Sequence, residues 1–223
     1  KDFYKKHQVD AHFVGHPLLD AIEDLPEINT EQFKKDHLLN EKEIIALLPG
    51  SREQEVTKML ELMLSVRPYF KDYQFVIAGA PSLPKEFYQK FVDENVHFVS
   101  NRTYDLLRCS KVALVTSGTA TLETALLNIP EVVCYKSSTI SYEIGKRVVK
   151  NIKYISLVNL IMDEEIVTEL IQKELTTENL VRELNHILKG EKRNQMLSDF
   201  EKLQNKLGGK GASDIAAEII ING

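Results

Sequence analysis

Two turns in this sequence combine glycine and hydroxyl residues, one of them with an arginine, in the way that binding of an anion requires. One of them, Ser117–Thr119, follows the apolar run Val112–Thr116 and opens a short apolar helix. A buried strand that runs directly into such a turn aims unpaired backbone N–H groups beyond its end, where the helix dipole also favours negative charge. This segment therefore predicts an anion-binding turn.

A similar turn lies upstream, where the apolar run Ile44–Leu48 leads into Gly50, Ser51 and Arg52. Gly50 permits close approach of the backbone to a ligand, and the guanidinium of Arg52 suits a phosphate oxygen. Ser51 starts the pattern of a capping box that ends at Gln54. An ordinary capped helix with a surface arginine explains the same residues equally well. Two turns that both favour phosphate suggest a nucleoside diphosphate as the ligand.

Glu123 is expected one turn into the helix that follows the second of these turns. Its carboxylate would repel a diphosphate, so a role in binding requires that it face hydrogen-bond donors such as the hydroxyls of a ribose. Stabilisation of the helix dipole by an acidic residue near the N-terminus is the alternative. The residues alone do not separate these two interpretations.

The elements that must position these residues alternate along the chain from Thr30 onward. Continuous apolar runs predict strands at 43–48, 75–78, 96–99, 112–116 and 131–135, and amphipathic segments predict helices at 30–39, 54–70, 84–92, 103–109 and 119–127. This alternation is typical of a parallel sheet covered on both faces, so we predict an α/β fold with a Rossmann-like, doubly wound parallel sheet.

The remaining segments are predicted to be mostly helical. After Ser138 we expect C-terminal helices at 141–150, 164–173, 177–188, 194–206 and 212–221, interrupted by a short strand at 154–157. At the other end of the chain, Val9–Gly15 is predicted to form a strand followed by a turn. The chain starts at Lys1 without a methionine, and we interpret it as a piece of a longer protein.

Composition excludes several classes of function. The formal net charge of −5 gives no general attraction for nucleic acid, and the six histidines show no ligand spacing for a metal. The two cysteines, Cys109 and Cys134, lie in apolar contexts that suggest a reducing compartment. No apolar run approaches the ~18 residues that a membrane span needs. We therefore expect a cytoplasmic or peripherally attached protein.

One basic stretch stands out in this acidic chain. Residues 136–153 hold five lysines and arginines and a single acid, Glu143. Such a stretch can face an anionic lipid surface, or its cations can complement a helix dipole, and both interpretations stay open. Lys136, just past a predicted strand, is the candidate ligand contact of this stretch.

Four motifs, taken together, resemble the C-terminal half of the lipid-A-disaccharide synthase family, whose members are two-domain glycosyltransferases of the GT-B type. They are Val14–Pro17, Leu48–Arg52, Ser117–Glu123 and Glu169–Gln172, and they occur in the family's order at plausible spacings. The resemblance runs from about Val9 to near the C-terminus. It implies a linker at residues 1–20, a donor-binding domain at 21–207, and a hinge and crossing helix at 208–223.

The resemblance also implies which residues bind the UDP part of the donor. No catalytic residue, metal or cofactor is expected in this chain, since the general base belongs to the N-terminal half. The implied donor-binding residues are Gly50, Ser51, Arg52, Ser117, Gly118, Thr119, Thr121, Glu123, Lys136, Asn159, Glu169 and Gln172.

The activity that the resemblance implies is transfer of 2,3-diacylglucosamine from UDP-2,3-diacylglucosamine to 2,3-diacylglucosamine 1-phosphate with inversion, in lipid A biosynthesis. The lipid acceptor is expected to bind through the missing half, so that this chain alone is inactive. It also implies a homodimer, peripheral to the inner membrane. The alternatives are a UDP-sugar 2-epimerase of GT-B architecture and a non-catalytic nucleotide-binding module.

Overall fold

The structure is a computed structural model that describes residue 4 and residues 7–9, 11–136 and 153–222. It divides into two compact units. One consists of residues 27–200, and the other combines residues 1–26 with 201–223. Each unit is described by itself.

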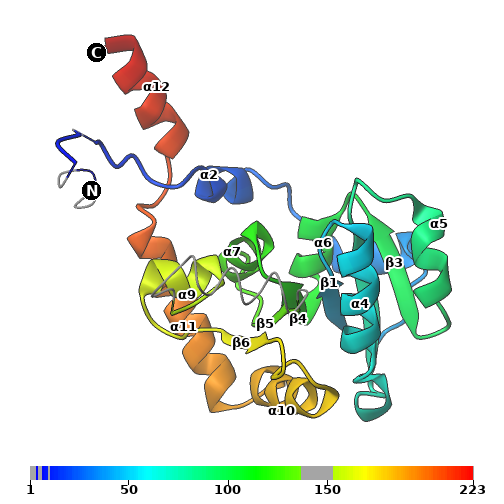
Figure 1. Cartoon of the computed structure of the whole chain (residues 1–223). Helices are drawn as coiled ribbons and strands as arrows, with labels where there is room; N and C mark the ends of the chain where they lie inside the picture. Colours follow the sequence, from blue (N-terminus) through cyan, green and yellow to red (C-terminus); the bar gives the residue numbers. More distant parts are fainter. Residues whose placement is uncertain (1–3, 5–6, 10, 137–152, 223) are drawn as a thin grey trace. The chain divides into compact units, whose positions relative to one another are not determined.

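The larger unit is built on a six-stranded sheet with the order β3-β2-β1-β4-β5-β6 (Figure 1). All neighbouring strands are parallel, and Ile45 of β1 pairs with Phe75 of β2 and with Val112 of β4. The chain reverses its direction across the sheet between β1 and β4, as in Rossmann-like folds. The strands are β1 (Glu43–Leu48), β2 (Tyr73–Gly79), β3 (Val96–Ser100), β4 (Ser110–Thr116), β5 (Glu131–Tyr135) and β6 (Thr168–Ile171).

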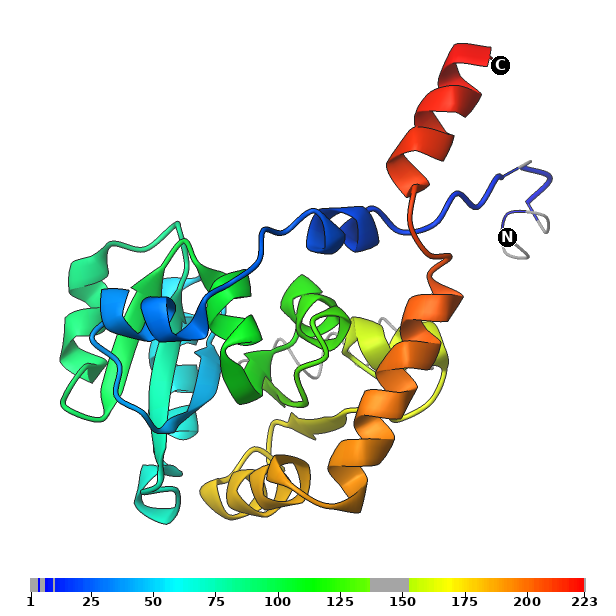
Figure 2. The same cartoon turned by 180° about the vertical axis from the view of Figure 1, so that it is seen from behind.

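Helices cover both faces of this sheet. Figures 1 and 2 show α4 and α3 on opposite sides of β1. On the α3 side, Phe33, Leu106 and Leu107 share one core cluster with Ala46, Val76 and Ala113 of the strands. The helices of this unit are α3 (Thr30–Asp36), α4 (Glu53–Leu64), α5 (Lys85–Tyr88), α6 (Thr103–Arg108), α7 (Thr119–Leu126), α9 (Leu157–Met162), α10 (Thr177–Leu188) and the first part of α11 (Glu191–Lys206). The predicted α/β fold is therefore confirmed.

The helix predicted at 54–70 is shorter than expected. α4 ends at Leu64, and a separate 3₁₀ turn follows at Arg67–Tyr69. Pro68 explains the break, because it has no backbone N–H to donate to the carbonyl of Leu64, four residues earlier, and its ring clashes with that carbonyl.

The prediction of a helix at 164–173 is wrong, and so is that of a strand at 154–157. Residues Thr168–Ile171 form β6, which pairs with β5 through Val132 and Val133, and α9 begins at Leu157. Pairing with the open edge of β5 outweighs the helical pattern of the segment. At α9, the Ser156 hydroxyl accepts a hydrogen bond from the N–H of Asn159 at 3.3 Å, which caps a helix rather than a strand. The helix predicted at 141–150 lies outside the described residues.

The smaller unit contains α2 (Pro17–Glu23), the end of α11 and α12 (Ala212–Asn222). The strand predicted in Val9–Gly15 is wrong, since residues 11–15 belong to no strand. The Asp20 carboxylate accepts hydrogen bonds from the N–H groups of Gly211 and Ser213 at 2.7 and 2.9 Å. These bonds, with a third from the Ser213 hydroxyl, lower the pKa of Asp20 and hold the N-terminus of α12. Among the described residues, no helix is long and apolar enough to cross a bilayer.

Candidate functional site

A pocket of about 370 Å³ lies at the carboxyl ends of β1, β2 and β4. Its walls are the two turns singled out from the sequence, with the end of β2 and the start of α6 between them. Ligands of open parallel sheets bind at this edge, where the strand order reverses. The lining residues are Leu48, Pro49, Gly50, Ser51, Ala78, Gly79, Ala80, Pro81, Thr103, Thr116, Ser117, Gly118, Thr119, Ala120 and Glu123.

The helices that begin at this pocket share one feature. α4, α6 and α7 have no capping hydrogen bond from a side chain, and their N-cap residues are Arg52, Arg102 and Gly118. By contrast α3, α9 and α10 are capped by the side chains of Asn29, Ser156 and Thr176. Apart from the N–H of Thr121, which donates to the backbone oxygen of Gly118 at 3.3 Å, the first-turn N–H groups at the pocket are therefore available to a ligand. The partial positive charge of each helix N-terminus favours an anion.

The capping box predicted from Ser51 to Gln54 is wrong. α4 begins one residue later, with Arg52 at the N-cap position, and the backbone oxygen of Ser51 instead accepts a hydrogen bond from Ser82 Oγ at 2.9 Å. The cause is Gly50, whose φ of +98° is a left-handed conformation that delays the start of the helix. This correction strengthens the prediction of an anion site, because a capped N-terminus would have had fewer free donors.

Arg52 does not line the pocket, but it directly follows the lining residue Ser51 and is the N-cap of α4. Its side chain is 82% exposed, and it pairs with Glu55 of the same helix at 3.3 Å. An exposed ion pair of this kind contributes about 0–1 kcal/mol, so the guanidinium can exchange Glu55 for a more highly charged anion at little cost.

Glu123 lies in the pocket with one hydrogen-bond donor beside it. The hydroxyl of Tyr104, in α6, donates to Glu123 Oε1 at 2.9 Å. Burial and the neighbouring carboxylate raise the pKa of Tyr104 to about 12, so the phenol stays protonated. Sequence reasoning missed Tyr104, because no motif marks it and only the packing of α6 beside α7 brings it to Glu123.

The other predicted residues of the second turn have different surroundings. Ser117 Oγ donates to the backbone oxygen of Ile155 at 2.9 Å, and the buried Thr121 donates to that of Gly118 at 2.9 Å. Both hydroxyls thus donate to backbone oxygens of the protein and support its fold, which is called the frame below. Thr119 is exposed at the first position of α7 and is one of the residues that line the pocket.

Asn159 and Glu169 lie together, but not at the pocket. Glu169 accepts hydrogen bonds from the N–H groups of Ile155 and Ser156 at 2.8 and 2.9 Å, from Ser156 Oγ at 2.7 Å and from Asn159 Nδ2 at 2.9 Å. The Asn159 side chain is fully buried and also bonds to the backbone of Ile166 and Val167. The two residues build the start of α9.

Gln172 and Lys136 also lie outside the lining of the pocket. Glu169 and Gln172 do not share a helix face, because the segment predicted as a helix at 164–173 contains a strand that ends at Ile171. The N–H of Gln172 donates to the backbone oxygen of Tyr135 at 2.8 Å. Lys136 is exposed directly after β5. The rest of the basic stretch, up to residue 152, lies outside the described residues.

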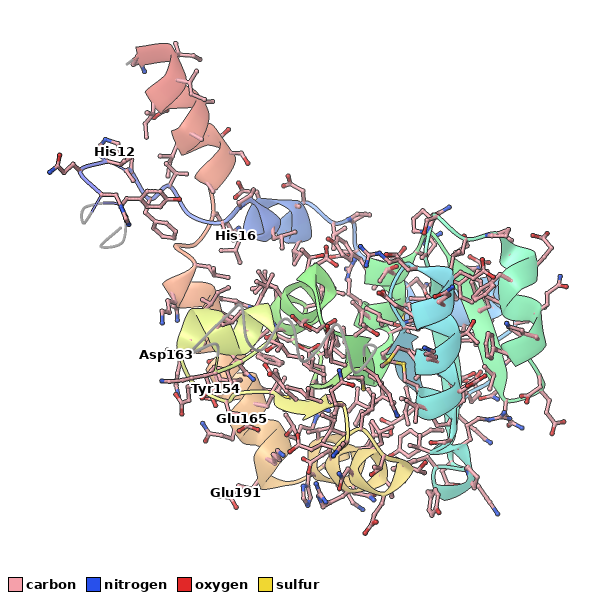
Figure 3. The ribbon with its side chains drawn as sticks, viewed as in Figure 1. His12, His16, Tyr154, Asp163, Glu165 and Glu191 are labelled. Atoms are coloured by element: carbon pink, nitrogen blue, oxygen red, sulfur yellow. The ribbon has the colours of Figure 1, made fainter. Side chains whose placement is uncertain are left out.

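Besides a pocket of about 390 Å³ lined by residues such as His37, Tyr88 and His97, two other pockets of the larger unit lie away from these turns. The largest, about 570 Å³, lies at the amino ends of β1 and β2, where Lys42 already donates to the backbone oxygen of Lys71 and Arg67 pairs with Asp93. Another, of about 370 Å³, runs along β6 beside Tyr154 and Glu165, which are labelled in Figure 3. Neither lies at the edge where helix N-termini converge, so the site is assigned to the carboxyl-end pocket. No group of three potential metal ligands occurs in the described parts of the chain.

Comparison with known proteins gives concordant results. A model of the lipid-A-disaccharide synthetase family matches residues 1–220. The lipid-A-disaccharide synthase of Syntrophus aciditrophicus is 35% identical, with 96% of this chain and 58% of that protein covered. That of Persephonella marina is 36% identical, with 99% and 62% covered. The chain therefore spans about three fifths of the length of these relatives.

Among solved structures, the UDP-GlcNAc 2-epimerase from Neisseria meningitidis bound to UDP-GlcNAc is similar with a TM-score of 0.59. Its sequence is 18% identical, and the alignment covers 94% of this chain and 55% of that one. This likeness concerns the fold alone, and it agrees with the prediction that this chain has the Rossmann-like architecture of GT-B proteins.

Proposed function

The chain belongs to the lipid-A-disaccharide synthetase family, and from this premise we propose that it is the donor-binding half of a glycosyltransferase of lipid A synthesis. Its substrate is UDP-2,3-diacylglucosamine, whose sugar is transferred with inversion to 2,3-diacylglucosamine 1-phosphate. The family match supports this function over a 2-epimerase. The observation that carries the proposal is the pocket at which three helix N-termini converge without capping side chains.

In this proposal the diphosphate of the donor lies against the first-turn N–H groups of α4 and α7. Transfer of the sugar leaves an additional negative charge on the departing UDP, and backbone donors already aimed at that charge stabilise it without reorganising. Arg52 adds a mobile guanidinium beside the lining residue Ser51. In this proposal Glu123 binds the ribose, and the base that deprotonates the acceptor hydroxyl is not assigned to a pocket-lining residue.

Binding of UDP to the unsubstituted chain and to Arg52→Ala, measured by titration calorimetry, tests the proposal. We expect Arg52→Ala to weaken UDP binding by about 1.5–3 kcal/mol, the scale of a hydrogen bond to a charged group, and to leave thermal stability unchanged. The matched control is Arg67→Ala, which removes a guanidinium from the larger pocket at the amino ends of the strands. Weakening by Arg67→Ala alone would place the nucleotide at the wrong edge of the sheet and refute the proposal.

A further inference from the structure

Glu123 is the sole ionisable side chain among the described residues that line the pocket. Every other polar group of that lining is a backbone group or a hydroxyl. Because the helix N-termini make the pocket attractive to anions, a carboxylate there opposes the binding of phosphate. Its presence therefore requires a part of the ligand that donates hydrogen bonds.

Tyr104 restricts how this carboxylate can turn. Its hydroxyl donates to Oε1 of Glu123, and no described hydrogen bond occupies Oε2. Each carboxylate oxygen can accept two hydrogen bonds, so Oε2 and one position on Oε1 remain open to a ligand. Two acceptor oxygens side by side match two neighbouring hydroxyls of a sugar.

The support for Tyr104 is rigid. It is the second residue of α6, whose Leu106 and Leu107 are fully buried against the sheet, and Arg102 and Asp105 form an ion pair across the first turn of the helix. Burial and Glu123 raise the pKa of Tyr104 to about 12, which keeps its proton available for donation at every pH at which the protein is handled.

From this geometry we infer that Tyr104 is a positioning residue that fixes the Glu123 carboxylate for the two hydroxyls of a ribose. The pair thereby selects ribonucleoside diphosphates over their 2′-deoxy counterparts. This inference rests on the proposed function, which places a nucleotide in the pocket, and adds to it a residue and a specificity.

The test is calorimetric titration with UDP, 2′-deoxy-UDP and inorganic pyrophosphate. For the unsubstituted chain we expect a preference for UDP over 2′-deoxy-UDP of about tenfold, the value of one hydrogen bond to a charged group. In Tyr104→Phe the preference should fall to about threefold or less, because a carboxylate that is free to turn holds the diol less well. Affinity for pyrophosphate should stay within about twofold, since pyrophosphate does not contact Glu123.

A double-mutant cycle separates positioning from direct contact. If Tyr104 acts through Glu123, then Tyr104→Phe should have no further effect on UDP affinity in a Glu123→Ala background. Tyr69→Phe is the matched control, because Tyr69 is 64% exposed in the 3₁₀ turn Arg67–Tyr69, away from the pocket. Thermal unfolding of each variant verifies that the fold is retained.

The outcomes are distinguishable. Loss of affinity by the same factor for all three ligands in Tyr104→Phe means that Tyr104 supports the fold of the pocket, and it overturns the inference alone. The inference also fails by itself if Tyr104→Phe leaves the preference for UDP unchanged. A failure of the unsubstituted chain to bind UDP overturns the proposed function and the inference with it.

Discussion

Glu123 and Glu169 were expected in one binding site, yet they line different pockets and differ in their hydrogen bonds. Glu123 accepts one hydrogen bond, from Tyr104. Glu169 accepts four, two of them from backbone N–H groups, and all come from Ile155, Ser156 and Asn159. Glu169 keeps one acceptor position, on Oε2, and so has less left to offer a ligand than Glu123. This difference supports the proposed binding role of Glu123 and a role of Glu169 in the fold.

The helices beside these carboxylates differ in the same way. The N-terminus of α9 has its hydrogen bonds satisfied within the protein. Ser156 caps the helix, and Glu169 accepts hydrogen bonds from the N–H groups of Ile155 and Ser156 just before it. The N-terminus of α7 has no capping side chain, because Gly118 occupies the N-cap position. Unsatisfied donors are tolerated where solvent or a ligand can reach them, and they are costly where the chain is packed. The caps therefore distinguish α7 from α9, although α5, which does not begin at the pocket, also has no capping side chain.

The largest expected effect of this difference is on stability. Glu169→Ala removes the acceptor of the N–H groups of Ile155 and Ser156, of the Ser156 hydroxyl and of one N–H of the Asn159 amide, whose other hydrogen bond to Val167 remains. Each lost acceptor costs about 1–3 kcal/mol when the donor is partly buried. We expect a loss of about 3–4 kcal/mol in the free energy of unfolding, measured by urea denaturation.

The matched control for that variant is Glu123→Ala. It removes the same group from the pocket, where solvent replaces the hydrogen bond of Tyr104, and should change the free energy of unfolding by less than about 1 kcal/mol. If Glu123→Ala proved the more destabilising of the two, the division into site and frame would be wrong.

The second effect concerns pH and a third carboxylate, Glu183 of α10, which belongs to the frame. Glu183 is buried, which by itself raises its pKa, but hydrogen bonds from Lys192, Arg182 and Thr168 outweigh burial and lower the pKa to about 2. Because the folded-state pKa is below the ordinary value of 4.5, this carboxylate stabilises the fold above pH 4.5, and the contribution is lost as the pH falls toward 2.

Glu183→Gln should therefore lower the free energy of unfolding by about 2–3 kcal/mol at pH 7. The difference from the unsubstituted chain should shrink below pH 4.5 and vanish near pH 2, in urea titrations repeated across this range. Glu178→Gln, at an exposed position of the same helix, is the control and should show no such convergence. A constant difference between about pH 7 and pH 3 would mean that Glu183 stabilises α10 by shape rather than by charge.

The sequence predicted the frame of the sheet well because its strands are buried on both faces. The bounds of β1 and β5 were predicted without error, and α10 likewise, since continuous apolar runs and a regular amphipathic pattern leave little choice. The segment Thr168–Ile171 was mistaken for a helix because β6 lies at the edge of the sheet and mixes polar with apolar residues. Its conformation depends on pairing with β5, which no local pattern encodes.

The candidate site was predicted in part. Both turns line one pocket, because strand-to-helix turns at neighbouring strands meet at one edge. Tyr104 was missed, and Asn159 and Glu169 were grouped with the turns although their hydrogen bonds close on α9. Sequence shows which residues can bind an anion or a hydroxyl. It does not show which of their acceptors and donors the protein already uses.

The smallest effect divides two hydroxyls of a single turn. Ser117 Oγ donates to the backbone oxygen of Ile155, which belongs to the frame around Glu169, whereas Thr119 is exposed at the first position of α7. Ser117→Ala should therefore lower the free energy of unfolding by about 1 kcal/mol, the net value of one neutral hydrogen bond, and leave UDP affinity within about twofold. Thr119→Ala should leave unfolding unchanged and weaken UDP binding by about 1 kcal/mol. Urea and calorimetric titrations of both variants test this. If Ser117→Ala weakened UDP binding and Thr119→Ala lowered the free energy of unfolding, Ser117 would belong to the binding site and Thr119 to the supporting structure.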